Sequence, residues 1–229
     1  MPSIKPNIVG GNLYHVFNRG VEKRIIFSDD NDRLRFIKGL YEFNNRNPVT
    51  ILGSANLRGR TPQVMGDRRQ REELVEICGF CLMPTHFHLL VRPLCDDGLS
   101  LFMQKNGSGY TCYFNLKHKR VGPLFQGAYK AKLVDDDTYA RQVFGYTHLN
   151  PAEFIQKDWK DGIKDWPKVE KFLKKYRWSS FANYFDENNG GFPIVNTSFF
   201  FDIFDDKNDR LSFLKGWSEL EGFDPSSSG

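Results

Sequence analysis

Two apolar runs separated by a single Pro-Thr pair constrain the fold of this chain more than any other feature. The runs cover Glu73–Met83 and His86–Val91, with Pro84-Thr85 between them. Runs of this length joined by so short a turn predict two adjacent antiparallel strands. Cys78 and Cys81 form a CxxC inside the first run, but no second pair accompanies them. We therefore expect core residues there and no zinc site.

The remaining segments place this pair within a strand–helix–strand–strand–helix–strand order, followed by a helix. Alternating apolar residues predict strands, and a 3.6-residue spacing with capping residues predicts helices. The other expected elements are a strand at 13–17, a helix from Ser28-Asp29 to about 44–48, a helix at 99–119, a strand at 128–134 and a helix from Asp135 to Leu149 that Pro151 ends. The order predicts an α+β, ferredoxin-like split βαβ fold with an antiparallel sheet.

Two glycines interrupt the long helix expected at 99–119. Gly107 and Gly109 each cost about 1 kcal/mol relative to alanine in a helix interior. We therefore expect a kink or a break in the middle of this helix.

The chain of 229 residues is long enough for one domain with a substantial extension. Its hydrophobic content of 40% and aromatic content of 15% suffice for a packed core. We expect the α+β domain at 1–155. Residues 156–229 then form a mainly helical extension packed on it, with a frayed end.

Several features predict a soluble, cytoplasmic protein. The first residues lack the apolar core of a secretory signal, and no apolar stretch approaches the roughly 18 to 20 residues that span a bilayer. Four cysteines are too few for a disulfide framework in a chain of this length. We expect no membrane partner.

Charge is segregated along the chain although the net charge is only +4. From Gly98 to Val134 there is no Asp or Glu, and a second basic cluster lies in a stretch at 52–72 that reads as an irregular insertion. The basic residues of the two regions are Lys105, Lys117, Lys119, Arg120, Lys130 and Lys132, and Arg58, Arg60, Arg68, Arg69 and Arg71. Such segregation is typical of a polyanion-binding face, although solvated helix faces also produce it.

His86-Phe87-His88 is the most informative triplet. Residues two apart on a strand share a face, so the two imidazoles project together while Phe87 enters the core. Two imidazoles on one face, with a third nitrogen or oxygen ligand, can bind a divalent metal. A pair of surface histidines on a sheet is the alternative.

Tyr146 and Asn150 lie four residues apart at the end of the last expected helix, and therefore on one helical face. The Tyr146 phenol is a candidate nucleophile, and the Asn150 amide oxygen is a candidate third metal ligand. An ordinary half-buried tyrosine is the alternative for Tyr146. His148 lies about 200° around the helix from Tyr146, so we expect it to point away.

Several blocks of the sequence resemble the HUH tyrosine transposases, which act on single-stranded DNA. These are YHVFNRG at 14–20, CLMPTHFHLLV at 81–91 and GPLFQGAYKAKLVDDDTYARQVFGYTHLNP at 122–151. The REP-associated tyrosine transposases are the most similar branch. The resemblance covers roughly residues 11–155 in the same order, whereas the C-terminal part matches only loosely around YRWSSFANY.

This resemblance implies a ferredoxin-like fold that binds Mg²⁺ or Mn²⁺ and a catalytic domain at 1–155. Carried over by motif position, His86 and His88 are the metal ligands, Asn150 is the third ligand and Tyr146 is the nucleophile. Thr85 stands where the family has Asn, and Thr147 stands where Ile is usual. Neither departure changes the groups that carry the chemistry.

The resemblance implies attack of Tyr146 on a DNA phosphate, which leaves a 5′-phosphotyrosine and a free 3′-hydroxyl. A phenol has a pKa of about 10, so the reaction requires activation of the hydroxyl, and the general base is not identified. Tyr110, Tyr113 and Tyr129 are competing tyrosines, each expected in the core or as a base-stacking platform. The expected DNA contacts are Arg19, Lys117, Arg120, Lys130 and Lys132.

The leading interpretation is a metal-dependent transposase that nicks and joins single-stranded DNA at hairpin-flanked sites. One alternative is a domesticated member that binds hairpin DNA or RNA without cleaving it. A hydrolase that uses activated water is another. A monomer is favoured over a homodimer on the resemblance, and the target sequence is not predicted.

Overall fold

The computed structural model describes residues 8–47, 71–186, 191–219, 223 and 225. Its strands are β1 (Leu13–Arg19), β2 (Val75–Met83), β3 (His86–Pro93) and β4 (Lys130–Val134). Its helices are α1 (Asp30–Glu42), α2 (Gly98–Lys117), α3 (Asp137–Leu149), α4 (Trp166–Lys175), α5 (Phe181–Phe185), α6 (Ser198–Ile203) and α7 (Lys207–Lys215). Short 3₁₀ turns cover Val21–Lys23, Asn150–Phe154, Trp159–Asp161 and Gly216–Glu219. Among the described residues, no helix combines the length and apolar character that crossing a bilayer requires.

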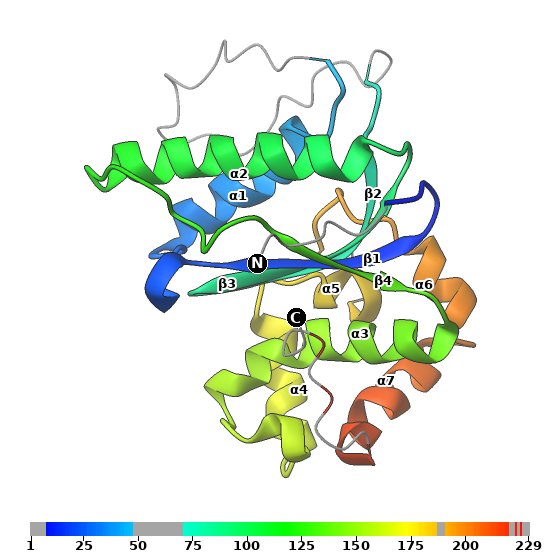
Figure 1. Cartoon of the computed structure of the whole chain (residues 1–229). Coiled ribbons are helices and arrows are strands. Elements are labelled where there is room, and N and C mark those ends of the chain that lie inside the picture. Colours follow the sequence, from blue (N-terminus) through cyan, green and yellow to red (C-terminus); the bar gives the residue numbers. More distant parts are fainter. Residues whose placement is uncertain (1–7, 48–70, 187–190, 220–222, 224, 226–229) are drawn as a thin grey trace.

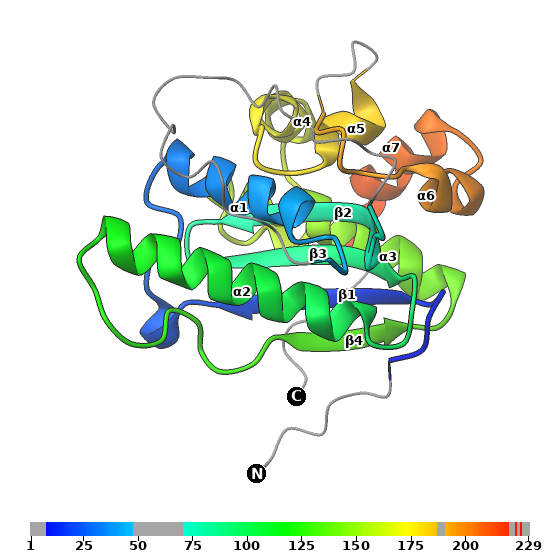
Figure 2. The same cartoon turned by 90° about the horizontal axis from the view of Figure 1, so that it is seen from above.

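The four strands form one antiparallel sheet in the order β2-β3-β1-β4. The helices α1 and α2 cover one face of this sheet, and α3 lies on the other face (Figures 1 and 2). This arrangement is the α+β split βαβ fold that the order of elements predicts. The strand pair around Pro84-Thr85 forms as expected, with Met83 opposite His86.

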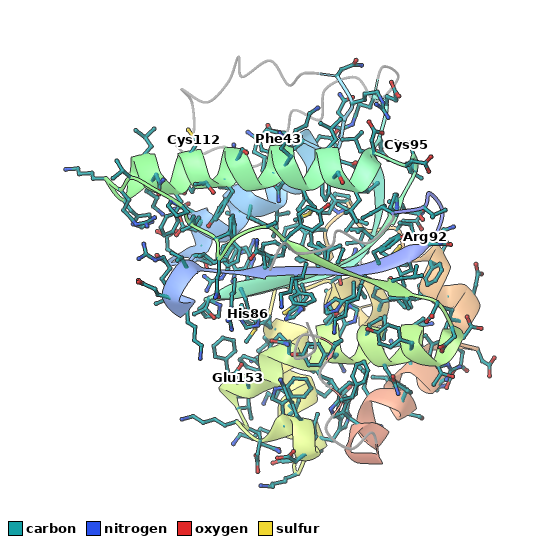
Figure 3. The ribbon with its side chains drawn as sticks, in the orientation of Figure 1. Phe43, His86, Arg92, Cys95, Cys112 and Glu153 are labelled. Carbon is teal, nitrogen blue, oxygen red and sulfur yellow. The ribbon has the colours of Figure 1, made fainter. Side chains whose placement is uncertain are left out.

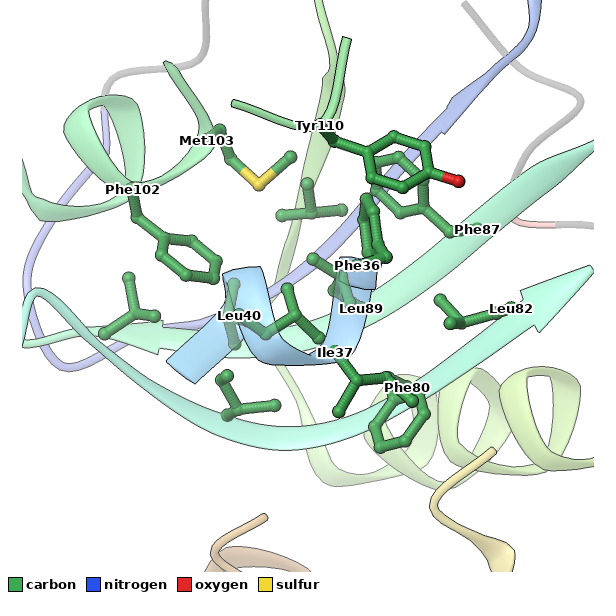
Figure 4. Close-up of a cluster of buried hydrophobic side chains, with 14 of the residues drawn as sticks. Phe36, Ile37, Leu40, Phe80, Leu82, Phe87, Leu89, Phe102, Met103 and Tyr110 are labelled. Carbon is green, nitrogen blue, oxygen red and sulfur yellow. The ribbon is translucent and has the colours of Figure 1, made fainter. Parts of the chain in front are cut away.

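The first core fills the space between the sheet and the pair α1 and α2 (Figure 4). Phe36 of α1 packs against Phe87 of β3 and Tyr110 of α2, with ring centroids 5.0 and 5.1 Å apart. Tyr110 is buried and donates its hydroxyl to the carbonyl oxygen of Ile26. Tyr110 therefore belongs to the core, and its burial raises the pKa of the phenol above its ordinary value.

The helix α2 runs without interruption from Gly98 to Lys117, so the expected kink or break at Gly107 and Gly109 is wrong. A Cβ at position 109 would lie 2.4 Å from Cζ of Phe43, the residue that follows α1. Glycine at 109 therefore lets α2 approach that ring closely. At position 107 a Cβ would meet no atom within 4 Å, so packing does not require glycine there.

The second core lies beneath the other face of the sheet, where α3 and the residues after 155 gather. Leu13, Leu90 and Val134 of the sheet contribute to it, together with Trp159 and Trp217 from the extension. Residues from both sides of position 155 share this core. The domain boundary between 155 and 156 itself stays a prediction, and the expected frayed end lies mostly outside the described residues.

The two cysteines of the CxxC are core residues, as predicted. Both side chains are buried and neither forms a disulfide. Burial raises the pKa of the Cys78 thiol to about 12 and also raises that of Cys81. Cys81 additionally forms an isolated bridge with Ser179, which attaches the extension to β2.

The two glycines of α2 provide a test of this packing. Gly109→Ala should be about 1 to 3 kcal/mol less stable than Gly107→Ala, because both gain the same helix propensity but only the first forces a methyl group into the Phe43 ring. Urea unfolding followed by circular dichroism measures the difference. Equal stabilities would contradict the close approach between α2 and Phe43.

Candidate active site

The register between β1 and β3 places both histidines of the triplet on the face that α3 covers. His88 is opposite Phe17, and His86 is opposite Arg19. Residues directly opposite each other in a sheet share a face, and Phe87 consequently points into the first core. The histidines therefore project together, as predicted.

The end of α3 meets these histidines. Nε2 of His86 lies 3.3 Å from Oδ1 of Asn150, and the ring centroids of His88 and Tyr146 lie 5.3 Å apart. Tyr146 is 2% exposed. The structure thus brings together the four residues that the sequence analysis selected. Figure 3 shows His86 at one end of β3 and Arg92 toward the other, so the site lies at the His86 end of the sheet.

His148 points away from this group, as its helical position predicts. Its Nδ1 donates to the carbonyl oxygen of Phe144 at 2.8 Å, and its Nε2 lies 2.8 Å from Oγ of Ser180. Burial lowers the pKa of His148 to about 4, so the ring is neutral and its Nε2 accepts a hydrogen bond from the Ser180 hydroxyl. Ser180 Oγ also accepts from the backbone N–H of Phe80 at 2.9 Å. His148 therefore helps to attach the extension to α3 and β2.

His15 is a member of the site that the sequence analysis missed. Its Nε2 lies 2.9 Å from Nδ1 of His88, and both rings are buried. Burial, together with electrostatic repulsion from His15, His86 and Lys160, holds the pKa of His88 well below its ordinary value. His88 is therefore neutral, which is the protonation state that a metal-binding imidazole requires. The available signal was the strand alternation of YHVFNRG, which puts His15 on the face of Phe17 and Arg19.

The donor atoms of the site fit a small divalent cation. Nε2 of His88 is buried and has no hydrogen-bond partner in the described part of the chain. Adjacent ligands of an octahedral ion with bonds of about 2.1 Å lie roughly 3.0 Å apart, close to the 3.3 Å between His86 Nε2 and Asn150 Oδ1. Within the described residues, no group of three or more His, Cys, Asp or Glu side chains is placed to hold a metal. Beside the two imidazoles, the Asn150 amide oxygen is the neutral donor that the structure places within reach.

A cleft of about 780 Å³ opens over these residues. Five basic side chains and one carboxylate, that of Glu153, lie among the residues that line it, and Figure 3 shows Glu153 near His86. The basic residues are Arg19, Lys23, Lys130, Lys157 and Lys160. Their excess over acids favours an anionic ligand.

Lys160 is a second residue that the sequence analysis missed. Its Nζ lies 5.2 Å from the centroid of the Tyr146 ring. It belongs to the turn Trp159–Asp161, in which the buried Trp159 packs 5.6 Å from Tyr146 between ring centroids. No motif in the sequence connects this turn with the end of α3. The extension nevertheless contributes a cation to the cleft.

The predicted DNA contacts fall into two groups. Arg19 and Lys130 line the cleft, and Lys132 lies on the same face of the sheet, opposite His15. Lys117 instead lies 2.8 Å from Asp29 and 2.7 Å from the buried carboxylate of Asp32.

Arg120 donates to Oδ1 of Asn115 at 2.8 Å. The structure does not bring Lys117 or Arg120 to the cleft, and their role in DNA binding stays a prediction without geometric support. Of the basic insertion, Arg58, Arg60, Arg68 and Arg69 lie outside the described residues. Arg71 packs over the ring of Tyr41, 3.9 Å from its centroid.

The competing tyrosines lie away from the histidine pair. Tyr113 donates its hydroxyl to Asp32 at 3.0 Å, and burial raises its pKa. The hydroxyl oxygen of Tyr129 lies 3.3 Å from Oγ of Ser100, on the α2 side of the sheet. Of the tyrosines considered as nucleophiles, Tyr146 is therefore the one whose ring lies beside the histidine pair.

A comparison with solved structures finds a REP-associated tyrosine transposase that was solved bound to a REP hairpin. The alignment covers 86% of this chain and 91% of that chain, with a TM-score of 0.51 and 13% sequence identity. The two proteins share a fold. No family model and no curated protein matches the sequence.

The contact between His15 and His88 provides a test of the candidate metal site. His15→Phe should weaken Mn²⁺ binding by about 10- to 100-fold, because the substitution removes the partner that orients the His88 ring. Titration of free Mn²⁺ by electron paramagnetic resonance measures the affinity. His15→Gln, which retains an acceptor, should lose less. Equal affinity of wild type and His15→Phe would contradict an orienting role for His15.

Proposed function

We propose that this protein is a metal-dependent enzyme that nicks and joins single-stranded DNA through a covalent tyrosine intermediate. The convergence of His86, His88 and Asn150 beside Tyr146 supports the proposal most directly. A nucleophile alone or a metal site alone would fit many activities. Their combination in a basic cleft fits phosphoryl transfer on a nucleic acid.

Hairpin-flanked DNA is the proposed substrate. The structural neighbour was solved bound to a REP hairpin, and its alignment extends over most of this chain. The cleft supplies the basic side chains that contact phosphates, including Arg19 and Lys130. Because residues of one chain form the whole constellation, we propose that a monomer contains a complete active site.

In the proposed reaction, Oη of Tyr146 attacks the scissile phosphorus. The bond between phosphorus and the 3′-oxygen breaks, and the proton lost by the phenol ends on the leaving 3′-oxygen, by way of solvent. The products are a 5′-phosphotyrosine and a free 3′-hydroxyl. The 3′-hydroxyl of another strand then attacks the phosphotyrosine, which restores the phenol and joins the DNA.

The side chains of the site have separate roles in this scheme. A divalent metal held by His86, His88 and Asn150 would supply Lewis-acid stabilisation of the phosphate charge. His15 fixes the ring orientation of His88. Lys160, near the attacking ring, supplies a fixed positive charge for the phosphate oxygens as the pentavalent transition state forms.

The burial of Tyr146 bears on the alternatives. With 2% of its surface exposed, the residue lies in a place from which bulk water is largely excluded. This favours transfer to a DNA hydroxyl over hydrolysis of the phosphotyrosine. The same burial would also suit a domesticated protein that binds hairpins without cleaving them, and this is the second candidate function.

Covalent trapping distinguishes these functions. Hairpin DNA with unpaired flanks, taken from the regions beside the gene, is incubated with the protein and Mn²⁺ or Mg²⁺ and resolved on a denaturing gel. Tyr146→Phe should abolish the protein–DNA adduct and the cleavage while sparing DNA binding, because only the nucleophilic oxygen is removed. Tyr139→Phe, on the same helix, is the matched control and should remain active.

Each other outcome of the trapping assay is informative. Cleavage without an adduct would indicate hydrolysis by water, and normal cleavage by Tyr146→Phe would overturn the nucleophile assignment. Tight hairpin binding by wild type without any cleavage would favour the non-cleaving binder.

Lys160 provides a separate prediction. Lys160→Met should slow adduct formation by about 100-fold, with little change in the Kd for DNA, because the charge acts mainly on the transition state. Lys164→Met is the matched control, since Lys164 is exposed and pairs with Asp158 at the surface. Single-turnover kinetics measure the rate, and Lys160→Arg should recover part of it. A loss confined to Kd would assign Lys160 to binding alone.

A further inference from the structure

A second hollow adjoins the cleft but lies on the α2 side of the sheet. This groove has a volume of about 1110 Å³, compared with about 780 Å³ for the cleft. One wall is α2, and the other is the segment that links α2 to β4, which runs back beneath α2 in Figure 1. Asn18 and Gln126 line both hollows. The groove and the cleft therefore share a rim.

The α2 wall of the groove is a single helical face. Ser100, Gln104, Gly107 and Thr111 recur at intervals of three or four residues and all line it. A helix-interior glycine costs about 1 kcal/mol relative to alanine, and no atom lies within 4 Å of a Cβ at 107. Packing within the protein therefore does not explain the glycine at 107. A ligand that lies against the helix at this position would explain it.

Aromatic rings form the rest of the groove. Phe36 and Phe87 are buried residues that line it, and Phe125 and Tyr129 are half-buried on the linking segment. The Phe125 ring packs against Phe87 with centroids 5.8 Å apart, which fixes its orientation. Half-exposed rings on a fixed support are suited to stacking with nucleobases.

The charge of the groove favours the same ligand. Among the described residues that line it, none is Asp or Glu, because most of the lining belongs to the acid-free segment Gly98–Val134. Lys130, which follows Tyr129, lines the adjoining cleft. A polyanion can therefore follow the groove as far as the rim without meeting a carboxylate of its described lining.

The groove also contains an amide with unmet hydrogen-bonding capacity. Asn106 is 1% exposed, and neither Oδ1 nor Nδ2 has a hydrogen-bond partner in the part of the chain that the structure describes. Its Oδ1 lies close to Gly39 of α1, where an added Cβ would lie 2.5 Å from it. This amide therefore belongs to the contact between α2 and α1, and the features of the groove that favour a nucleic acid are its rings and its charge.

We propose that this groove binds the unpaired nucleotides beside the cleaved bond. Their bases stack along Phe125 and Tyr129, and the strand crosses the rim at Asn18 and Gln126 to reach the cleft. The inference rests on the proposed function, because it presupposes a single-stranded substrate in the cleft. It adds a separate site that holds the flank of that substrate on the opposite side of the sheet.

Filling the groove tests this inference. Gly107→Trp places a large side chain where the structure has open space, so the fold should tolerate it. Leu116→Trp is the matched control, since Leu116 lies on the same helix, is 82% exposed and does not line the groove. Kd is measured without metal for a hairpin with an unpaired flank and for the same hairpin without it.

In wild type and Leu116→Trp, the flank should strengthen binding at least tenfold. Gly107→Trp should abolish this gain while leaving the affinity for the flankless hairpin unchanged. Retention of the full gain by Gly107→Trp would overturn the proposal. So would a flank that gives no gain in wild type.

A second measurement uses the wild-type chain. Cys112 is exposed and lines the groove, whereas Cys95 lies elsewhere and serves as the internal control. The flanked hairpin should slow maleimide labelling of Cys112 at least fivefold and leave Cys95 unchanged. Unchanged labelling of Cys112 at saturating DNA would contradict the proposal.

Failure of the groove and failure of the proposed chemistry are distinguishable. Protection of Cys112 without a Tyr146 adduct would support the groove as a DNA-binding site and contradict the proposed enzymatic activity. An adduct without protection of Cys112 would support the enzymatic activity and contradict the groove proposal.

Discussion

The register between β1 and β3 is the constraint on which the candidate site depends. A shift of one residue would turn His86 and His88 into the first core and bring Phe87 to the face that α3 covers. Burial of the Phe87 ring against Phe36 opposes such a shift, because an aromatic side chain would lose its apolar surroundings. The packing that stabilises the core on one face therefore fixes the position of the histidines on the other.

The second face of the sheet changes character along its strands, and this change locates the cleft. Leu13 lies at one end of β1 in the second core, whereas Arg19 at the other end lines the cleft. The apolar end of this face is shielded from water by α3 and the extension, which pack on it. Trp159 is part of this packing and carries the turn that places Lys160 over Tyr146. The extension thus contributes to the candidate site through the same residues that exclude water from the core.

Local periodicity made much of this structure predictable, and long-range contacts account for the rest. The spacing of His86 with His88, and of Tyr146 with Asn150, gives each pair one face of one element, which sequence alone can show. The contact between His15 and His88 joins residues on different strands, so the alternation along β1 indicates the face of His15 but not this contact. Helix propensity likewise predicted a break in α2, but the contact of Gly109 with the ring after α1 is a tertiary feature. Tertiary context overrides propensity at such positions.

The basic residues of the acid-free segment show which part of a sequence charge pattern predicts a binding face in the folded protein. Lys117 looked available in the sequence, yet it pairs with Asp29, which caps α1, and with Asp32 within α1. A basic residue can thus be paired by an acid from anywhere in the chain, and its presence in a cluster is weak evidence for a binding face. The absence of acids is different, because no rearrangement of the segment can place a carboxylate from it on the groove wall. The absence of Asp and Glu from Gly98 to Val134 is therefore a stronger indication of where a polyanion can lie than the lysines in the same segment.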